Sequence, residues 1–569
     1  VPRYAYIKAM TPDGPTDTPW EYDGETGIAR FENGRACAVN RLNGRPMPQS
    51  EVAVLLAPGE KVTFEYALSH TPIEEDRIEQ LADFDFDGRL DECREFWRSK
   101  LDGVASIHVP ERRIDEMIRA GLLHLDLVSY GLEPDQPVAA TIGRYCPIGS
   151  ESSPIIQFFD SMDWPELARR SLHYFLEKQH DDGFIQNFGG YMLETGAALW
   201  SMGEHYRYTR DQEWVKEVRD ELLLSCEYLL DWRERNKKPE LRGRGYGLIE
   251  GKVGDPEDPY RQFMLNGYAY LGLQRVSEML ADVDSEESER LREEARQWRE
   301  DIRTALVTGM AESPVVPLGD GSWAPSCPPW AEMRGPVSLY VTGEPCWTHG
   351  TVNARDSLVG PVYAIYQEIL DPGEPLADFL VHTHQELFTI RNVGFSQPYY
   401  CRHDYAHLAR GEVKAFLKTY YNAVAGLADR ETYTFWEHYF GASPHKTHEE
   451  AWFLMQTRWM LWLEQEQSLR LLPGVPRRWL RAGKSIELDG VATHFGTMSV
   501  RVTSGEDARR IEAEVEFHSS DRLPETLRIR LPHPDRRRAV HVEGGDYNAE
   551  TETVTVANPG RKVQVRAEF

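Results

Sequence analysis

Two loops in this sequence carry carboxylates beside aromatic residues, and each loop precedes a long apolar helix. The first loop spans 247–260 and carries Glu250 and Asp255; the second carries Glu437 next to Trp436. Hydrolysis of a glycosidic bond needs two carboxyl groups, because one protonates the leaving oxygen and the other activates a water molecule or attacks carbon. If the two loops face one pocket, they supply both groups.

The first loop holds more acids than one reaction needs. Glu250, Asp255, Glu257 and Asp258 lie within nine positions. Repulsion between like charges could keep one of them protonated near neutral pH, as a proton donor requires. Asp255 and Glu250 are both candidates for the general acid, and Asp258 is a third. The alternative is an acidic loop that faces water or binds a cation.

Composition excludes several classes of function. The chain has 569 residues and a net charge of 64 − 92 = −28. Nucleic acids and anionic membranes need a basic footprint, so neither is expected as a partner. An acidic polysaccharide is also disfavoured unless a pocket holds local arginines. No apolar run is long enough to span a membrane.

The cysteines indicate a reducing compartment. There are seven, an odd number, and no two have CxxC spacing. Neither a disulfide framework nor a zinc ribbon is therefore expected, and a cytoplasmic location is favoured. Because the chain begins with Val1 instead of Met, a leader or upstream segment could have been removed. Oligomeric state is not predicted from the sequence.

The hydrophobic pattern changes three times along the chain. Residues 1–72 contain strand-like segments and are expected to be part of a β-sandwich. Residues 73–106 are expected to form a charged helical linker. Residues 107–469 have apolar positions at spacings of three and four in one segment after another, with long loops between helices. Residues 470–569 alternate with period two and predict a small C-terminal β-sandwich. The fold class is therefore mainly α, with β segments at both ends.

Two metal motifs are considered and not adopted. Asp83–Gly88 resembles the start of a calcium loop, but its twelfth position is Arg94 instead of a bidentate Glu. The cluster of His445, His448, Glu449 and Glu450 lacks the HExxH order, and acidic residues at the start of a helix have a simpler role in stabilising it. We expect no metal and no cofactor.

Several motifs resemble those of inverting six-hairpin glycosidases with an (α/α)6 barrel. Tyr191–Trp200, followed by Glu204–Asp211, is similar to a helix of the glucoamylase-like family 15. The Gly-Leu-Ile-Glu250 segment is similar to a motif whose Glu is the general acid in that family, although Ile249 replaces a Trp. Residues 250–255, read with Leu265–Tyr270, instead resemble the trehalase and processing-glucosidase families, whose acid is an Asp.

The resemblance implies an (α/α)6 barrel over about 107–470, an inverting mechanism and action from the end of a glycan. The Phe-Trp-Glu437-His-Tyr segment is similar to the motif that carries the general base in the trehalase-like families. Glu151 stands where family 15 has the Asp of an Arg-Asp pair, but Ser150 replaces the Arg, which puts glucose specificity in doubt. Glu194 belongs to the family 15-like helix.

Further candidates for sugar binding lie in polar, aromatic loops between predicted helices. Sugar hydroxyls are usually bound by carboxylates, Arg and His, and aromatic rings stack on apolar sugar faces. In chain order, the candidate substrate-binding residues are Glu151, Asp160, Gln186, Tyr191, Glu194, Asp258, Trp347, His349, Arg355, Asp356, Tyr400, Arg402, His403 and Trp436. Each of these loops could also be a surface turn.

Two other classes of function remain open. One is a different carbohydrate-active enzyme on the same fold: a phosphorylase, a lyase using the Tyr399–His403 segment, or an epimerase. The other is a glycan-binding protein without activity. No GxSxG or phosphate-loop motif supports a serine nucleophile or nucleotide chemistry.

Overall fold

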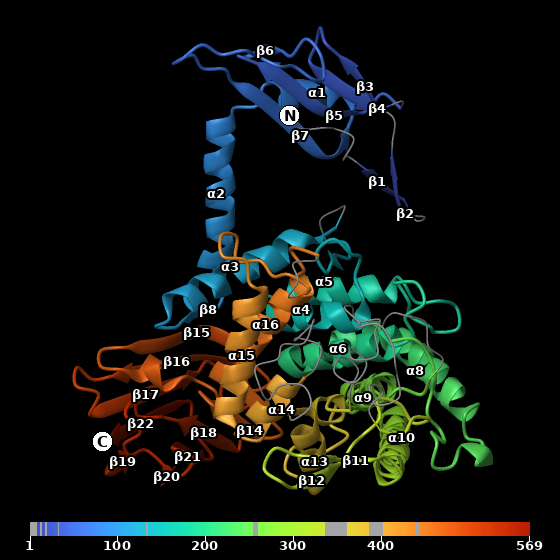
Figure 1. Cartoon of the computed structure of the whole chain (residues 1–569), viewed down its shortest axis with the longest axis vertical. Helices are drawn as coiled ribbons and strands as arrows, with labels where there is room; N and C mark the ends of the chain where they lie inside the picture. The colour runs from blue at the N-terminus through green and yellow to red at the C-terminus, as the bar shows by residue number, and fades with distance from the viewer. Residues whose placement is uncertain are drawn as a thin grey trace. The chain divides into compact units, whose positions relative to one another are not determined.

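A computed structural model of the chain (Figure 1) describes residues 8–11, 14–17, 20–31, 33–131, 135–253, 260–335, 361–385, 402–438 and 443–569. The chain divides into two compact units, residues 1–102 and residues 103–569. The boundary therefore falls within the segment 73–106 that the sequence predicts to be a linker.

The first unit is a β-sheet with two helices. Its described strands are β1 (Lys8–Thr11), β2 (Gly14–Asp17), β3 (Trp20–Asp23), β4 (Ile28–Phe31), β5 (Ala36–Leu42), β6 (Arg45–Pro46) and β7 (Phe64–Ile73). β3, β4, β5 and β6 are neighbours in order, β7 also pairs with β5, and all these pairs are antiparallel. Of the two strands that the sequence pattern favoured here, only the one near Val62–Leu68 forms; residues 52–57 are not a strand.

The linker helices form as expected, as α1 (Glu75–Ala82) and α2 (Phe86–Asp102). Ile78 of α1 is buried against Ile28, Ala36 and Val39 of the sheet, which gives α1 a fixed place within the first unit. A second apolar cluster, around Phe31 and Cys37, covers the other face of these strands.

The second unit is rich in helices. Its described α-helices are α3 (Arg112–Val128), α4 (Gly149–Ser161), α5 (Pro165–Leu176), α6 (Glu194–Thr209), α7 (Gln212–Glu217), α8 (Arg219–Glu234), α9 (Phe263–Leu280), α10 (Ser285–Ala311), α12 (Tyr363–Tyr366), α13 (Pro375–His384), α14 (His403–Ala409), α15 (Val413–Leu427) and α16 (Thr447–Leu461). Among the described helices, none combines the length and apolar character needed to cross a bilayer.

The apolar spacing predicts helices at 155–178, 213–235 and 448–469; the structure divides the first two, the second into α7 and α8, and shortens the third. The single helix expected at 155–178 is two, because Asp163 has a φ of 60° and Pro165 begins α5, where its fixed φ and missing N–H suit the first turn of a helix. The helix expected at 448–469 ends at Leu461, where the chain becomes a strand. α14 was not predicted, and α9 has the predicted bounds.

α4, α6, α9 and α16 pack side by side and run in the same direction. At the first turns, Gly149 of α4 donates to Glu194 of α6; at the last turns, Asp160 of α4 contacts His205 of α6. α6 and α9 meet closely at Gly196, where a Cβ would lie 2.7 Å from the backbone nitrogen of Ala269. Gly203 of α6 meets Arg275 of α9 further along, and α16 follows the same direction, since Lys446 before it contacts Glu151 of α4 and Arg458 near its end contacts Tyr208 of α6. The N-terminal ends of the four helices therefore share one side of the unit.

Residues 462–568 form most of two sheets. β13 (Trp462–Gln465), β14 (Ser468–Leu471), β18 (Thr526–Arg530), β21 (Thr553–Ala557) and β20 (Asp546–Asn548) make one, in that order. The other contains β19 (His541–Glu543), β22 (Lys562–Glu568), β17 (Arg510–Phe517), β16 (Gly496–Ser504), β15 (Ser485–Thr493) and β8 (Ser106–His108). β8 comes from the end of the predicted linker, so the C-terminal sheets are not built from the C-terminal sequence alone.

Small antiparallel pairs complete the second unit: β9 (Ser129–Tyr130) with β10 (Ala139–Ala140), and β11 (Val315–Pro317) with β12 (Trp323–Pro325). They lie in the connections between helices. The ends of those connections, together with the N-terminal turns of the parallel helices, carry the candidate site.

Candidate active site

Lys446 lies at the centre of a buried cluster of carboxylates. Its Nζ is 3.2 Å from Oε1 of Glu437 and 3.1 Å from Oε2 of Glu151. All three side chains are buried, and they come from three places: the loop before α16, the loop after α15 and the first turn of α4. The structure therefore brings the predicted base and one predicted sugar-binding residue together through a lysine that the sequence analysis did not select.

Backbone hydrogen bonds and aromatic packing fix the loop of Glu437. The N–H of Glu437 donates to the carbonyl of Ser443, and the N–H of Lys446 donates to the carbonyl of Phe435, so the two sides of the loop face each other. The ring of Phe435 stacks on Phe453 of α16, with centroids 5.2 Å apart. The apolar residue before Trp436 thus anchors the loop while Glu437 turns toward Lys446.

The lysine and the two carboxylates stabilise one another as ions. Burial acts to raise the pKa of Glu151, but the ammonium of Lys446 reverses this, and the pKa lies below its usual value. For Lys446, burial acts to lower the pKa, and the charges of Glu151, Glu449 and Glu437 raise it above its usual value. A buried charge is tolerated when it is paired in this way.

Glu449, in the first turn of α16, adds a third carboxyl group to the cluster. It is fully buried, and within the described residues neither of its oxygens has a hydrogen-bond partner. Burial raises its pKa well above the usual value; the charge of Lys446 opposes this shift, and the carboxylates of Glu437 and Glu151 add to it. Burial therefore favours the protonated form of Glu449 more strongly than it does for Glu151, whose charge is paired with Lys446.

His448 completes this side of the cluster. The indole of Trp452 donates to its Nε2 at 2.8 Å, so the neutral ring carries its proton on Nδ1, which lies 3.2 Å from Oε1 of Glu449. Burial lowers the pKa of His448 to about 3, which agrees with a neutral ring. His448 and Glu449 are thus parts of the site, a role that the expectation of simple helix-start stabilisation did not include.

Glu450 points elsewhere. Its Oε1 lies 2.7 Å from Nδ1 of His124 in α3, and the carboxyl group is buried. It therefore joins α16 to α3. Among the described residues, no three His, Cys, Asp or Glu side chains are placed to hold one metal ion.

Arg402 contacts the cluster through Trp452, whose indole also donates to His448. Its guanidinium is 3.6 Å from the ring centroid of Trp452 and 3.6 Å from Oδ2 of Asp404, and the side chain is buried. Its φ of 51° places it in the left-handed region just before α14. His403, next to it, packs edge-on against His384, with Nδ1 atoms 3.2 Å apart. Of this predicted pair, Arg402 is tied to the aromatic wall of α16, and His403 to α13.

Glu194 connects the cluster with the loop of Gln186 and Tyr191. It accepts hydrogen bonds from the backbone of Asn187 at 3.1 Å, Phe188 at 2.8 Å and Gly149 at 3.3 Å. Gly149 precedes Glu151 by two residues. Burial raises the pKa of Glu194 to about 7, although these three N–H groups act to lower it.

Gln186 and Tyr191 shape the loop above Glu194. The side-chain amide of Gln186 donates to the carbonyl of Tyr191 at 2.8 Å, and the ring of Tyr191 packs on Phe188. The ammonium of Lys252 lies 5.2 Å from the centroid of Tyr191. Lys252 belongs to the first carboxylate loop, so a continuous set of contacts runs from that loop to Gly149 and Glu151.

Glu250 is the described acid of that first loop. Its Oε2 accepts a hydrogen bond of 2.6 Å from the amide of Asn236 and lies 3.8 Å from the guanidinium of Arg261. Asn266 of α9 holds the chain next to it, accepting from the N–H of Ile249 and donating to its carbonyl. The loop is thus attached to the N-terminal half of α9, on the same side of the unit as Glu151 and Glu194.

Asp160 is not part of this assembly. It is buried at the last turn of α4, where it contacts His205 at 2.8 Å. It is nine positions after Glu151 in the helix, which corresponds to about 13 Å along the helix axis. Asp160 therefore joins the C-terminal ends of α4 and α6, whereas Glu151 and Glu194 lie at their N-terminal ends. The structure does not place Asp160 with the other candidates.

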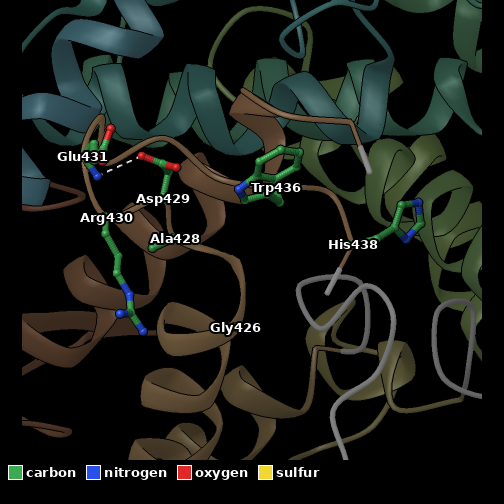
Figure 2. A pocket seen from close by; sticks show the side chains of 7 residues that line it. All are labelled: Gly426, Ala428, Asp429, Arg430, Glu431, Trp436 and His438. Atoms are coloured by element: carbon green, nitrogen blue, oxygen red, sulfur yellow. Dashed lines mark hydrogen bonds between the residues drawn. The ribbon is translucent and has the colours of Figure 1, made fainter. Parts of the chain in front are cut away.

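Trp436 and His438 flank Glu437 and line a pocket of about 320 Å3 together with the turn after α15, residues 426–431 (Figure 2). In that turn, the backbone of Glu431 donates to Asp429 at 2.9 Å. The carboxylate of Glu437 is directed toward Lys446 instead of being among the lining residues. The pocket gives the loop an open side beside the buried cluster.

Seven predicted site residues lie outside the part of the chain that the structure describes: Asp255, Asp258, Trp347, His349, Arg355, Asp356 and Tyr400. Two of these, Asp255 and Asp258, are candidates for the general acid. The sequence analysis did not select Lys446, and it assigned His448 and Glu449 to the start of a helix instead of to the site. The signal that could have indicated all three is the run of charged residues immediately after the loop of Glu437.

The fold is similar to that of solved glycoside hydrolases. An α-L-rhamnosidase from Dictyoglumus thermophilum aligns with 82% of this chain and 51% of its own length, at a TM-score of 0.50 and 11% identity. The shared feature is the fold. This chain resembles the (α/α)6-barrel glycosidases in fold. It spans about half the length of that rhamnosidase.

Two further solved structures are similar at lower scores. A bacterial glucoamylase complexed with acarbose has a TM-score of 0.46 and 10% identity, over 70% of this chain and 62% of its own. A rhamnosidase from Klebsiella oxytoca with rhamnose bound has a TM-score of 0.42 and 13% identity, over 63% and 66%. No protein-family model and no curated protein sequence matches the chain.

Proposed function

We propose that this protein is an inverting glycoside hydrolase that acts from the end of a glycan, with Glu437 as general base and Asp255 as general acid. The observation that carries the proposal is the ion pair of Glu437 with Lys446, inside the protein and at the N-terminal side of a layer of parallel helices. We further propose that these helices are the inner layer of an (α/α)6 barrel and that the C-terminal sheets form a β-sandwich.

The ammonium of Lys446 supports the role of Glu437. A general base has to be ionised before it can take a proton from water, and burial without a partner would favour the neutral acid. An ammonium 3.2 Å away keeps the carboxylate charged. Oε1 of Glu437 faces Lys446, and Oε2 lies 4.0 Å from Nε2 of His438.

The contacts of Glu250 favour Asp255 as the acid. Asn236 donates an N–H to Glu250, and the guanidinium of Arg261, which donates to Asn236, lies 3.8 Å from the same oxygen. A donor and a positive charge suit a carboxylate better than a carboxylic acid, which needs an acceptor for its own proton. Glu250 would then fix the loop that carries Asp255. For inversion, the two catalytic carboxyl groups would stand about 6.5–9.5 Å apart with the water between them.

The remaining groups suit a sugar ring. Oε1 of the buried Glu449 lies 3.2 Å from Nδ1 of His448, and Oε2 has no hydrogen-bond partner among the described residues, so Oε2 can bind a hydroxyl group without breaking an existing bond. Arg402 and Glu151 add a donor and an acceptor, and Trp436 offers an aromatic face. Gln186, Tyr191 and Glu194 would position the loop that closes the pocket.

The test is hydrolysis of a panel of aryl glycosides and oligosaccharides, which includes α-L-rhamnosides and maltooligosaccharides because of the structural and sequence resemblances. Proton NMR would follow the anomer that forms first. We expect the inverted anomer, and a fall in kcat of about 10³-fold or more in Glu437→Gln, in the range of lost general base catalysis.

Glu234→Gln is the matched control, because Glu234 is an exposed carboxylate at the end of α8 whose ion pair within the described residues is with the nearby Lys237. It should keep full activity. Retention of configuration would exclude the inverting mechanism, and full activity of Glu437→Gln would exclude Glu437 as the base. Turnover that depends on phosphate, or an unsaturated product, would favour the phosphorylase or lyase alternatives.

A further inference from the structure

One face of the five-stranded sheet is polar and rich in arginine. The residues of β14, β18 and β21 alternate, so that Leu469, Leu527 and Val554 are buried on one side of the sheet. Their neighbours Arg470, Arg528 and Thr555 therefore point to the other side. We call this side, with Arg530, Thr553 and Asn548, the polar face.

The polar face lines a groove of about 590 Å3. The opposite wall consists of the turn before α13, Asp371–Gly373, and the turn after α14, Ala409–Gly411. A groove of this size lies in the range of small-molecule sites, about 300–1,000 Å3. It lies against residues that take no part in the proposed catalytic site.

Four arginines line this groove, in a chain with a net charge of −28: Arg410, Arg470, Arg528 and Arg530. Two of them are neutralised by carboxylates. Arg410 contacts Asp378 and Glu412, and Arg530 contacts Glu552. Asp371 is the one acidic residue among those that line the groove.

The other two arginines, Arg470 and Arg528, lie next to each other without such a partner. They are register partners in the parallel pair of β14 and β18. Arg470 donates to the carbonyls of Ala409 and Leu408, at 3.2 and 3.4 Å, and Arg528 is exposed. Among the described residues, neither guanidinium has a carboxylate within ion-pair distance. Two adjacent like charges are unfavourable until an anion lies between them.

The lowered pKa values of two arginines in the groove also favour binding of an anion there. Burial, and then the charge of Arg528, lower the pKa of Arg470. Burial also lowers the pKa of Arg530 to about 10, although Glu552 opposes the shift. A bound anion would relieve both effects, since an opposite charge favours the charged form of a guanidinium.

The neighbours of these arginines are hydroxyl and amide groups. Thr555 is the register partner of Arg528, and Thr553 is that of Arg530, on β21. Asn548 of β20 pairs with Thr553 in turn. Rows of this kind can donate to and accept from sugar hydroxyls, whereas the two arginines suit a planar or tetrahedral oxyanion.

We propose that this groove is a second carbohydrate site, which binds a sugar unit bearing a carboxylate or sulfate group between Arg470 and Arg528. The site holds the local arginines without which an acidic sugar would be repelled by a chain of this charge. The proposal does not depend on the assignment of the catalytic residues.

The experiment is isothermal titration calorimetry of the full chain at low ionic strength, with digalacturonic acid, a sulfated chondroitin disaccharide, maltose and inorganic sulfate as separate ligands. We expect one of the acidic disaccharides to bind, maltose not to bind, and inorganic sulfate to bind at least about tenfold more weakly than the disaccharide. Binding should weaken as salt is added.

Arg528→Gln is the informative variant, because Arg528 is exposed and its guanidinium has no carboxylate within ion-pair distance in the described part of the chain. It should lower the affinity for the acidic disaccharide by about tenfold or more, the expected loss for a hydrogen-bonded charge pair. Arg537→Gln is the matched control: it makes the same charge change at an exposed arginine outside the groove. It should leave the affinity unchanged.

Three results would overturn the proposal. The first is that neither acidic disaccharide binds, and the second is equal binding of maltose or of inorganic sulfate, which would make the groove a neutral-sugar or free-anion site. The third is an equal effect of Arg528→Gln and Arg537→Gln, which would show a general effect of charge. Loss of glycosidase activity in Glu437→Gln with intact disaccharide binding would separate this site from the catalytic one.

Discussion

The ammonium of Lys446 lies 3.2 Å from the carboxylate of Glu437, and both groups are buried. The same ammonium reaches Glu151, which is 286 positions before Glu437 in the chain. A single lysine thus lies within ion-pair distance of two carboxylates from opposite ends of the helical region. The predictions below follow from this cluster and from the helices that present it.

Lys446→Met should be strongly destabilising. It would leave two buried carboxylates without a counter-charge, and breaking a buried ion pair on one side costs about 3–5 kcal/mol. Urea unfolding would measure the free energy of unfolding. The double variant Lys446→Met, Glu151→Gln should be more stable than the sum of the single effects predicts, because it leaves one unpaired charge instead of two. Strict additivity would show that the three groups do not interact.

The pH dependence of stability should contain a contribution from Glu194. Its pKa is raised from 4.5 to about 7 in the folded chain, so the folded state binds this proton more tightly than the unfolded state. The resulting stability is complete below pH 4.5 and is lost as the pH rises toward 7, by about 3 kcal/mol at most.

Unfolding measured across this pH range would test the contribution of Glu194. Glu194→Gln keeps an acceptor for the three backbone N–H groups but cannot titrate, so its stability should fall less than that of the wild type between these pH values. Equal pH profiles of the two proteins would contradict the assignment.

Asp255→Asn and Glu250→Gln should differ in their dependence on the leaving group. If Asp255 is the acid, Asp255→Asn should lose about 10²–10⁴-fold in kcat on a glycoside with a poor leaving group. On a dinitrophenyl glycoside the loss should be much smaller, because that leaving group departs without protonation. Glu250→Gln should show a similar loss on both substrates, since it acts on loop position. The reverse pattern would make Glu250 the acid.

Gly196→Ala tests the close approach of α6 and α9. The added Cβ would lie 2.7 Å from the backbone of Ala269, closer than such atoms come. Alanine is favoured over glycine in a helix by about 0.5–1 kcal/mol. We nevertheless expect Gly196→Ala to lower the free energy of unfolding by about 1–3 kcal/mol, and this loss would be due to crowding. Gly189→Ala is the control, because nothing lies within 4 Å of its new Cβ. Thermal unfolding of both variants makes the comparison, and equal midpoints would argue against tight packing there.

Periodicity alone determined much of the helical architecture. The bounds of α9 and α6 follow from apolar residues at spacings of three and four. This spacing places the apolar side chains on one face of a helix, whatever that face packs against. Boundaries failed where a local conformation overrode the pattern. At 163–165, a left-handed residue and a proline divide one apolar run into α4 and α5. After Leu461, the apolar run continues as β13. The sequence pattern did not show this change, because short buried strands and buried helices have similar apolar composition.

The sequence also pointed to Glu437 and Glu151 separately, from motif resemblance, and to a pair of carboxyl groups as the chemistry. Only the tertiary structure decided that Lys446 joins them, that Glu449 is a buried carboxyl group of the candidate site with a raised pKa, and that Asp160 lies at the other end of α4. These are questions of distance and burial between residues far apart in the chain. Sequence spacing carries no information about them, because ionisation depends on which groups folding brings together in a place without water.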